Sequence, residues 1–203
     1  MITIKRQAKK NILAHYDLGD ELYQTFLDSK MQYSSAIFDV ESNSLEEAQV
    51  NKLTRICDQL KLREDDHLLE VGSGWGGLAI FAAENYGCQV TTTTISDNQY
   101  RYAKNKIDAA GLSNKINLLS DDYRLLQGKF EKVVSVEMIE AVGKKYLSGY
   151  FQKLNDLLKP GGLLMLQAIT IADQRLKSYS SNEDFIQKHI FPGGFLPSVY
   201  LIS

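Results

Sequence analysis

The chain contains little of what marks several common classes of protein. Its two cysteines, Cys57 and Cys88, lie far apart without the spacing of metal ligands, so we expect no metal site and two reduced core cysteines. No apolar run reaches the length of a membrane span, and residues 1–11 lack the apolar segment of a signal peptide. Neither an internal repeat nor a low-complexity linker is visible. We therefore expect a cytoplasmic location.

The formal net charge is only -2, which argues against a dedicated nucleic-acid binder. One local exception is the basic cluster Lys5, Arg6, Lys9 and Lys10. This cluster could contact anionic lipid at about 1 kcal/mol per charge near the surface. A solvated terminus is the alternative, and the cluster alone favours it. The apolar fraction of 44% over 203 residues suits one sizeable α/β domain.

Strands and helices are predicted to alternate along most of the chain. A helix is expected over 12–28 and an irregular stretch over 29–43, and the capping box at 44–47 begins a helix that ends near residue 61. Strands are then expected at 67–71, 88–95, 116–120, 132–137 and 162–170, and helices at 76–86, 97–110 and 144–158. Pro160-Gly161-Gly162 is a type II turn signal between the last helix and the fifth strand. This alternation predicts an α/β fold with a doubly wound, mostly parallel sheet.

The most informative segment is a glycine-rich turn between a strand and a helix. An apolar run ends at Glu70, and Gly72, Gly74 and Gly76 follow. Glycines permit positive φ angles and let a ligand approach the backbone closely. A purely structural turn is the alternative, but the strand–turn–helix context favours a ligand. The functional interpretation places Gly72 and Gly74 against S-adenosylmethionine.

The segment after the second predicted strand argues against NAD. A dinucleotide-binding fold carries Asp or Glu about 20 residues after the glycines, where it binds the ribose hydroxyls. This chain has a run of threonines at 91–94 instead, so Thr94 and Gln99 become candidates to hold a ribose. Gln99 has an equal alternative role, because Ser96-Asp97-Asn98-Gln99 is a capping box in which it would close the helix start.

Two further polar groups follow predicted strands. Tyr123 and Arg124 come after the third strand and could cover an adenine, although a surface loop is the favoured alternative on these residues alone. Glu137 and Glu140 follow the fourth strand, at the edge where open α/β sheets bind ligands. Glu140 is the better candidate because it lies beyond the strand, and an acidic residue at a helix start is an equal alternative.

Taken together, these motifs resemble the cyclopropane-fatty-acyl-phospholipid synthases, which include the mycolic acid cyclopropane synthases. The resemblance covers nearly the whole chain and rests on segments 15–19, 33–34, 45–49, 70–77, 122–124, 158–162 and 191–194 and on Glu140. It implies a class I methyltransferase fold in which residues 1–62 form a helical segment over the cofactor site and residues 63–203 form an incomplete Rossmann-like core. The apolar, breaker-rich loop 191–197 adds the expectation that the chain is part of a longer protein.

The resemblance also implies S-adenosylmethionine as donor and the cis double bond of an unsaturated phospholipid acyl chain as acceptor. Peripheral contact with a membrane surface is expected, and a homodimer is left open. Carried over by position, the cofactor contacts are Tyr33, Ser34, Glu70, Gly72, Ser73, Gly74, Thr94, Ile95, Gln99, Tyr123 and Arg124.

Members of this family hold a bicarbonate ion that acts as the base, and its site is altered here. By resemblance, Glu140 and the backbone at Val136 would contact the ion. Ser35 stands where the family has a cysteine, and Gln167 stands where it has a histidine. Both can bind an anion by hydrogen bonds, but the positive charge that a histidine can carry is lost. We hypothesise that Ser35 and Gln167 shift the reaction from ring closure toward methyl- or methylene-branched chains, or tune a cyclopropane-forming enzyme. A small-molecule methyltransferase and a cofactor-binding module without activity are the rival interpretations.

Overall fold

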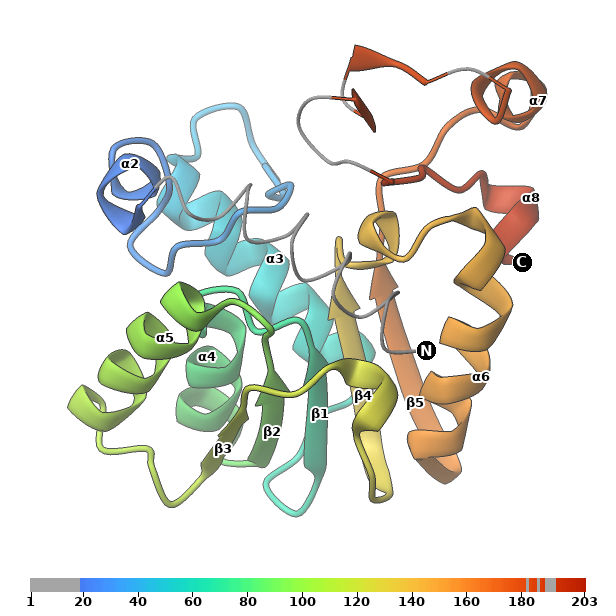
Figure 1. Cartoon of the computed structure of the whole chain (residues 1–203). Coiled ribbons are helices and arrows are strands. Elements are labelled where there is room, and N and C mark those ends of the chain that lie inside the picture. The colour runs from blue at the N-terminus through green and yellow to red at the C-terminus, as the bar shows by residue number, and fades with distance from the viewer. Residues whose placement is uncertain (1–18, 182, 186, 189–192) are drawn as a thin grey trace.

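A five-stranded parallel sheet lies at the centre of the molecule (Figure 1). The computed structural model describes residues 19–181, 183–185, 187–188 and 193–203. The strands are β1 His67–Val71, β2 Gln89–Thr93, β3 Ile116–Leu119, β4 Phe130–Val136 and β5 Leu158–Gln167. They follow the order β3-β2-β1-β4-β5, and the four pairings are parallel. The predicted doubly wound α/β fold is thus confirmed.

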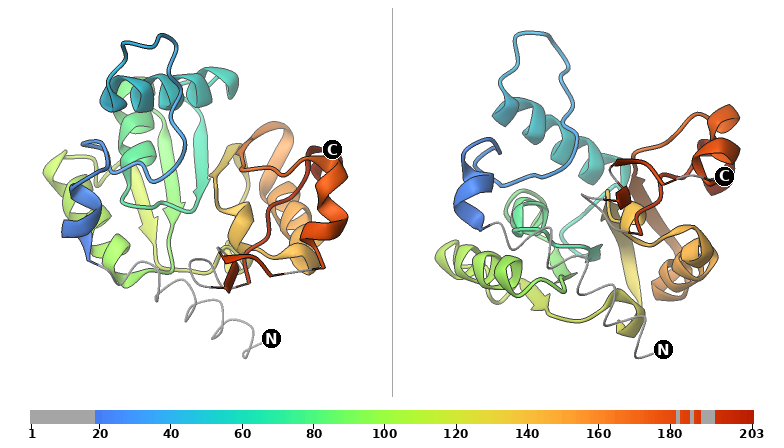
Figure 2. Two further views of the ribbon diagram at one scale, coloured as in Figure 1. Left: turned by 90° about the horizontal axis from the view of Figure 1, so that it is seen from above. Right: turned by 45° about the horizontal axis from the view of Figure 1, so that its top comes forward.

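Helices cover both faces of this sheet (Figures 1 and 2). The described helices are α2 Asp20–Gln24, α3 Leu45–Gln59, α4 Gly77–Tyr86, α5 Asp97–Ala109, α6 Leu147–Leu157, α7 Leu176–Tyr179 and α8 Val199–Ile202. Four 3-10 turns join them: η1 Tyr123–Leu125, η2 Ile139–Ala141, η3 Lys144–Tyr146 and η4 Asp173–Arg175. In the described part of the chain, no helix is both long and apolar enough to span a membrane.

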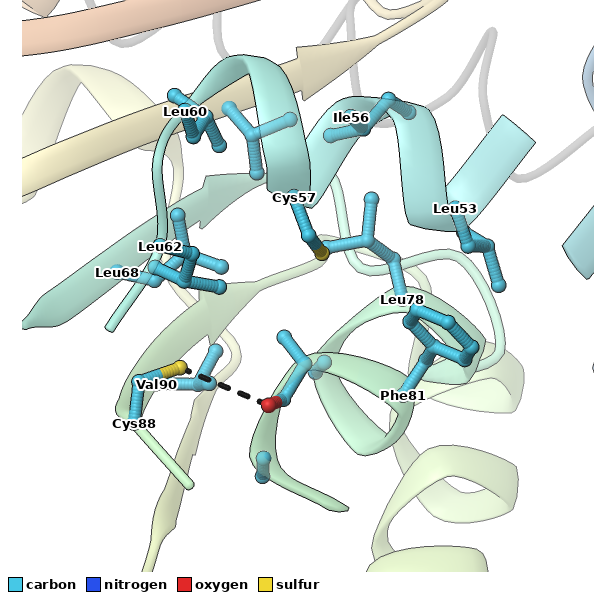
Figure 3. Close-up of a cluster of buried hydrophobic side chains, with 14 of the residues drawn as sticks. Leu53, Ile56, Cys57, Leu60, Leu62, Leu68, Leu78, Phe81, Cys88 and Val90 are labelled. Carbon is cyan, nitrogen blue, oxygen red and sulfur yellow. Dashed lines mark hydrogen bonds between the residues drawn. The ribbon is translucent and has the colours of Figure 1, made fainter. Parts of the chain in front are cut away.

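The core on one face joins α3, α4 and α5 to the sheet (Figure 3). Leu53 of α3 and Leu68 of β1 are fully buried there, beside Leu78 of α4. Cys57 and Cys88 belong to the same core as free thiols, and burial raises the pKa of Cys57 to about 12 and that of Cys88 to about 11. The expectation of two buried, unpaired cysteines is confirmed.

The opposite face packs against α6. Leu69 and Val71 of β1 point to this side and meet Tyr150 of α6. Because side chains alternate along a strand, Glu70 points to the α3 side instead. Phe195 joins the same core from the C-terminal segment, which pairs with the chain after β5 through an Ile171–Ser198 bridge.

Several local predictions hold and others need correction. The capping box is complete, since Ser44 Oγ accepts from Glu47 N and Glu47 Oε2 accepts from Ser44 N. The expected helix over 12–28 is too long at its end, because the helix stops at Gln24. There the carboxylate of Asp28 accepts from the backbone N–H groups of residues 30 and 32 and turns the chain. Residues 12–18 and the basic cluster lie outside the described residues.

The Pro160-Gly161-Gly162 signal does not separate a helix from a strand. Strand β5 begins at Leu158, which already pairs with Phe130, so the predicted start at 162 is wrong. Gly161 has the positive φ of 77° that a type II turn requires, but the extra residues form a bulge inside the strand. The other predicted strands and helices agree with the structure to within three residues at each end.

Truncation of a core side chain tests the packing of α3 against the sheet. Leu53→Ala should lower the free energy of unfolding by about 2–5 kcal/mol, because Leu53 is fully buried and the truncation leaves a cavity. Leu22→Ala on α2 is the control, since Leu22 is 45% exposed. Urea unfolding of both variants measures the difference, and equal losses would contradict this packing.

Candidate functional site

The candidate site lies where the carboxyl ends of β1, β2 and β4 meet, at the point where strand order reverses. The glycine turn after β1 is anchored by Ser73 N, which donates to Thr93 O at 2.8 Å. Gly72 and Gly74 have φ angles of 101° and 50°. A Cβ on Gly74 would meet no atom within 4 Å, so this glycine borders open space that a ligand can enter. A Cβ on Gly72 would lie 3.3 Å from Met138, which brings the loop after β4 against the turn.

Thr94 and Gln99, which are both buried, form one side of the site. Thr94 Oγ1 donates to Gln99 Oε1 at 2.9 Å. Ser96 does cap helix α5, because its Oγ accepts from Gln99 N, but Ser96 N donates to Thr94 Oγ1 rather than to Gln99. The Gln99 side chain is therefore directed to Thr94 at the end of β2 and does not close the helix. Ile95 is half-buried beside them.

The segment after β3 supplies the next side. Asp122 accepts from Arg124 Nε at 2.8 Å and from Arg124 N at 3.0 Å. The Arg124 guanidinium lies 5.8 Å from the centre of the Tyr123 ring, which meets Tyr150 edge-on at 5.5 Å. Tyr123 is thus packed against the α6 core, unlike a side chain of an ordinary surface loop.

The irregular stretch before α3 passes over the site. Tyr33 meets the rings of Tyr23 at 5.4 Å and Phe26 at 6.3 Å. Ser34 is fixed by α3, because Ser34 O accepts from Gln49 Nε2 at 2.9 Å. The same stretch runs so close to α4 that a side chain at Gly77 would collide with the carbonyl of Lys30.

Sequence reasoning missed Lys52, a fully buried cation of α3. Lys52 Nζ donates to Ser34 Oγ at 2.7 Å, and burial lowers the pKa of Lys52 to about 8 against the opposite effect of Glu137, Asp28 and Glu70. Glu70 is also buried, and burial raises its pKa to about 8 while Thr92 Oγ1 donates to it at 2.6 Å. The sequence signal that could have identified Lys52 is its helical spacing, because residue 52 is four positions from Ala48 and from Ile56 on the inner face of α3.

A carboxylate joins the residues expected around the anion. Glu137 Oε1 accepts from Ser35 N at 2.9 Å and from Gln167 Nε2 at 2.8 Å. Gln167 Nε2 also donates to Ser35 O at 3.1 Å. Glu140 Oε1 accepts from Ile169 N at 2.6 Å, and burial, with a smaller effect of Glu137, raises the pKa of Glu140. The structure thus brings Ser35 and Gln167 together around Glu137, with Glu140 within electrostatic range of Glu137.

The backbone at Glu137 is strained. Its φ of 49° is in the left-handed region, which costs a residue other than glycine about 1–2 kcal/mol. Val136, the expected backbone contact, lies directly before it and pairs in register with Gln167. Glu137 N donates to Gln167 O at 2.8 Å and so continues the pairing of β4 with β5 past the strand end.

The described residues suit one implied small molecule and not the other. Open space beside Gly74, with Thr94 and Gln99 across the sheet end, fits a nucleoside sulfonium such as S-adenosylmethionine. A bicarbonate between Ser35 and Gln167 does not fit, since Ser35 N and Gln167 Nε2 already donate to the carboxylate of Glu137. Among the described residues, no group of three or more His, Cys, Asp or Glu is placed to hold a metal ion.

A shallow hollow lies elsewhere, between α4 and α5, and is lined by residues that include Trp75, Phe81 and Tyr102. It is flanked by helices rather than by the ends of strands, where open α/β sheets bind their ligands. We therefore place the candidate site at the sheet edge.

The fold and this site define the Rossmann-like class of S-adenosylmethionine-dependent methyltransferases, as similar solved structures confirm. Residues 3–203 match the family model described as mycolic acid cyclopropane synthetase, and the chain belongs to this family. The crystal structure of mycolic acid cyclopropane synthase CmaA1 complexed with SAH and CTAB has a TM-score of 0.88 and 28% identity, and the match covers 96% of this chain and 71% of that one.

Curated relatives agree with this family. The tuberculostearic acid methyltransferase UfaA1 of Mycobacterium tuberculosis is 41% identical over an alignment of 203 positions, which covers 97% of this chain and 47% of the relative. The cyclopropane-fatty-acyl-phospholipid synthase of Escherichia coli K12 is 41% identical over 189 residues, which cover 93% of this chain and 47% of the relative. The chain thus spans about half the length of these two relatives.

Acid should loosen the stretch that carries Tyr33 to Ser35. Glu46 accepts from Ser29 Oγ and N at 2.6 and 2.8 Å and pairs with Lys30, and the Ser29 hydrogen bonds lower its pKa from 4.5 to about 2. Because the folded-state pKa is lowered, the stability that this carboxylate supplies is present above pH 4.5 and is lost as pH falls toward 2.

Glu46→Gln should therefore destabilise the protein more at pH 6 than at pH 3.5 in urea titrations. Glu41→Gln, in the exposed part of the same stretch, is the control and should show no such difference. A Glu46→Gln effect that is the same at both pH values would contradict this role.

Proposed function

We propose that the protein transfers a methyl group from S-adenosylmethionine to the cis double bond of an unsaturated fatty acyl chain of a phospholipid. Membership of the family supports the reaction class. The observation that carries the proposal is the meeting of the glycine turn with the acidic loop after β4, where Gly72 faces Met138, which lies between Glu137 and Glu140 in the sequence. A donor site thereby adjoins a group able to accept a proton.

Proposed donor contacts come from every side of the sheet end. Gly72, Ser73 and Gly74 would lie along the donor, Thr94, Ile95 and Gln99 would hold its ribose, and Tyr123 and Arg124 would cover its adenine. Tyr33 and Ser34, from the proposed covering segment 1–62, would close over it. Glu70 would support the donor site from the core through its hydrogen bond with Thr92, rather than by direct contact with the donor. When bound, the sulfonium supplies an electrophilic methyl group.

An alkene is a weak nucleophile, so the chain must act mainly by positioning. Alignment of the double bond behind the methyl group can supply about 7–11 kcal/mol in the best case. Methyl transfer leaves a carbocation on the acyl chain, and an aromatic face such as that of Tyr33 can stabilise a cation by about 0.5–2 kcal/mol. Exclusion of water protects this cation from capture.

Contact with a membrane surface is part of the proposal, because the acceptor is a phospholipid. Apolar side chains of the stretch that covers the site are exposed: Leu22, Phe26, Phe38 and Val40 are 45–55% accessible. Such a group of exposed apolar side chains would suit the edge of a lipid layer. The cytoplasmic location and a homodimer stay predictions.

Incubation of the intact protein with labelled donor and vesicles of unsaturated phospholipid tests the acceptor. We expect label in the acyl chains, with mass spectrometry separating cyclopropane from branched products. Vesicles of fully saturated phospholipid are the control and should stay unlabelled, because they lack the double bond. Label in soluble amines or phenols but not in lipid would favour a small-molecule methyltransferase.

Two glycines provide a matched test of the donor site. Gly74 and Gly111 both have positive φ angles, 50° and 70°, and a Cβ on either would meet nothing within 4 Å. Alanine should therefore strain each backbone to a similar degree, by about 1–2 kcal/mol. Only Gly74→Ala should weaken the binding of S-adenosylmethionine, by at least about tenfold or 1.4 kcal/mol.

Calorimetric titration of the donor measures this, and Gly111→Ala should bind as the parent does. Gly111 ends helix α5 away from the sheet edge. If both variants bind S-adenosylmethionine with the same affinity as the parent, the donor does not lie beside Gly74. If the parent itself does not bind S-adenosylmethionine, the proposed function is refuted.

A further inference from the structure

The position expected for a bound anion is already filled by the chain itself. Ser35 N and Gln167 Nε2 are the hydrogen-bond donors that converge there, and both point at Glu137 Oε1. Gln167 also bridges to Ser35 O, so the two donor segments are fixed to each other around the carboxylate. A protein carboxylate and a bicarbonate present the same kind of oxygen to such donors, and one carboxylate oxygen satisfies both of these.

The backbone is adapted to aim this side chain. Glu137 adopts a φ of 49°, an angle at which glycine is the usual residue. Its N–H group is bonded to Gln167 O, so both its backbone and its side chain are tied to the same residue of β5. Strain of this kind in a cleft is common where a side chain must be presented to a ligand.

The local charges also disfavour an additional anion. Glu140 lies close enough that Glu137 contributes to its raised pKa, and Glu140 Oε2 is buried with no hydrogen-bond partner among the described residues. Lys52 is the buried cation whose charge interacts with Glu137. A bicarbonate would add negative charge beside two carboxyl groups and would find Ser35 N and Gln167 Nε2 already donating within the chain.

We propose that Glu137, rather than a bound bicarbonate, is the base of the reaction, with Ser35 and Gln167 as positioning residues. This inference rests on the proposed function. In methyl transfer the S–CH3 bond breaks with its electron pair going to sulfur, and the alkene π electrons form the new C–C bond. Glu137 Oε2 then accepts a proton from one of two positions. Loss from the transferred methyl group lets the released C–H electron pair bond to the cationic carbon, which closes the ring, whereas loss from a carbon next to the cation lets that pair form a double bond.

A binding experiment tests the site without catalysis. Carbon-13 NMR of labelled bicarbonate should show no binding to the parent protein. Glu137→Gly should bind it, because glycine suits a φ of 49° and leaves Ser35 N and Gln167 Nε2 free to hold an anion. Binding by the parent that Gln167→Ala abolishes would overturn the inference, as would a folded Glu137→Gly variant that binds none.

A turnover experiment with unsaturated phospholipid vesicles tests the role. Turnover by the parent should be the same in carbonate-free buffer as with added bicarbonate. Glu137→Gln should lower turnover by about 100-fold or more with donor affinity unchanged, as expected for loss of a base. Glu137→Gly should be equally slow in carbonate-free buffer and should recover at least tenfold with bicarbonate.

Glu131→Gln, at the opposite end of β4, is the charge-matched control and should turn over as the parent does. Bicarbonate-dependent turnover by the parent, or full turnover by Glu137→Gln, would refute the role of Glu137. If the parent binds the donor but methylates no lipid, the proposed function fails. The NMR experiment still decides, independently of that failure, whether the carboxylate fills the anion position.

Discussion

The site depends on one interaction, the attachment of Ser35 and Gln167 to the carboxylate of Glu137. This contact joins three segments that are far apart in the sequence: the irregular stretch before α3, the loop after β4 and the end of β5. Without this contact, the stretch that carries Tyr33 and Ser34 would be held over the sheet end mainly by its contacts with α3. Because an unpaired carboxylate in a partly buried cleft is costly, the three segments are positioned together.

A network of buried charged side chains supports the contact of Ser35 and Gln167 with Glu137. Lys52 reaches from the inner face of α3 to Ser34, and Glu70 and Glu137 lie within its electrostatic range. Burial of charges seldom adds stability, because desolvation offsets the attraction, but removal of one partner leaves the other uncompensated. The network therefore fixes where α3 and its preceding stretch sit on the sheet. The apolar contacts of Leu53 and Leu68 supply the stability of the same interface.

Local patterns predicted the fold well and the site only in part. The capping box, the glycine turn and the apolar strand runs are short-range signals, so the sheet and its helices followed from them. The Pro160-Gly161-Gly162 signal predicted a turn between the last helix and the fifth strand, but strand pairing already at Leu158 makes that boundary wrong. Lys52 was missed, and Glu137 was ranked below Glu140, because the contacts of both residues are tertiary. Helical spacing places Lys52 on the inner face of α3, but nothing nearby in the sequence shows that it reaches Ser34 or that Glu137 meets residue 35.

The altered residues around the anion position are best understood as one set. Ser35 uses its backbone N–H rather than its side chain, so the identity of its side chain matters little for this contact. Gln167 is a neutral donor and therefore cannot attract a free anion from solution as a charged histidine can. A carboxylate attached to the chain needs no such attraction, because its effective concentration is set by the backbone that carries it. A neutral donor at 167 and the carboxylate that we propose as the base at 137 are thus complementary, and their separate effects on the reaction should not be additive.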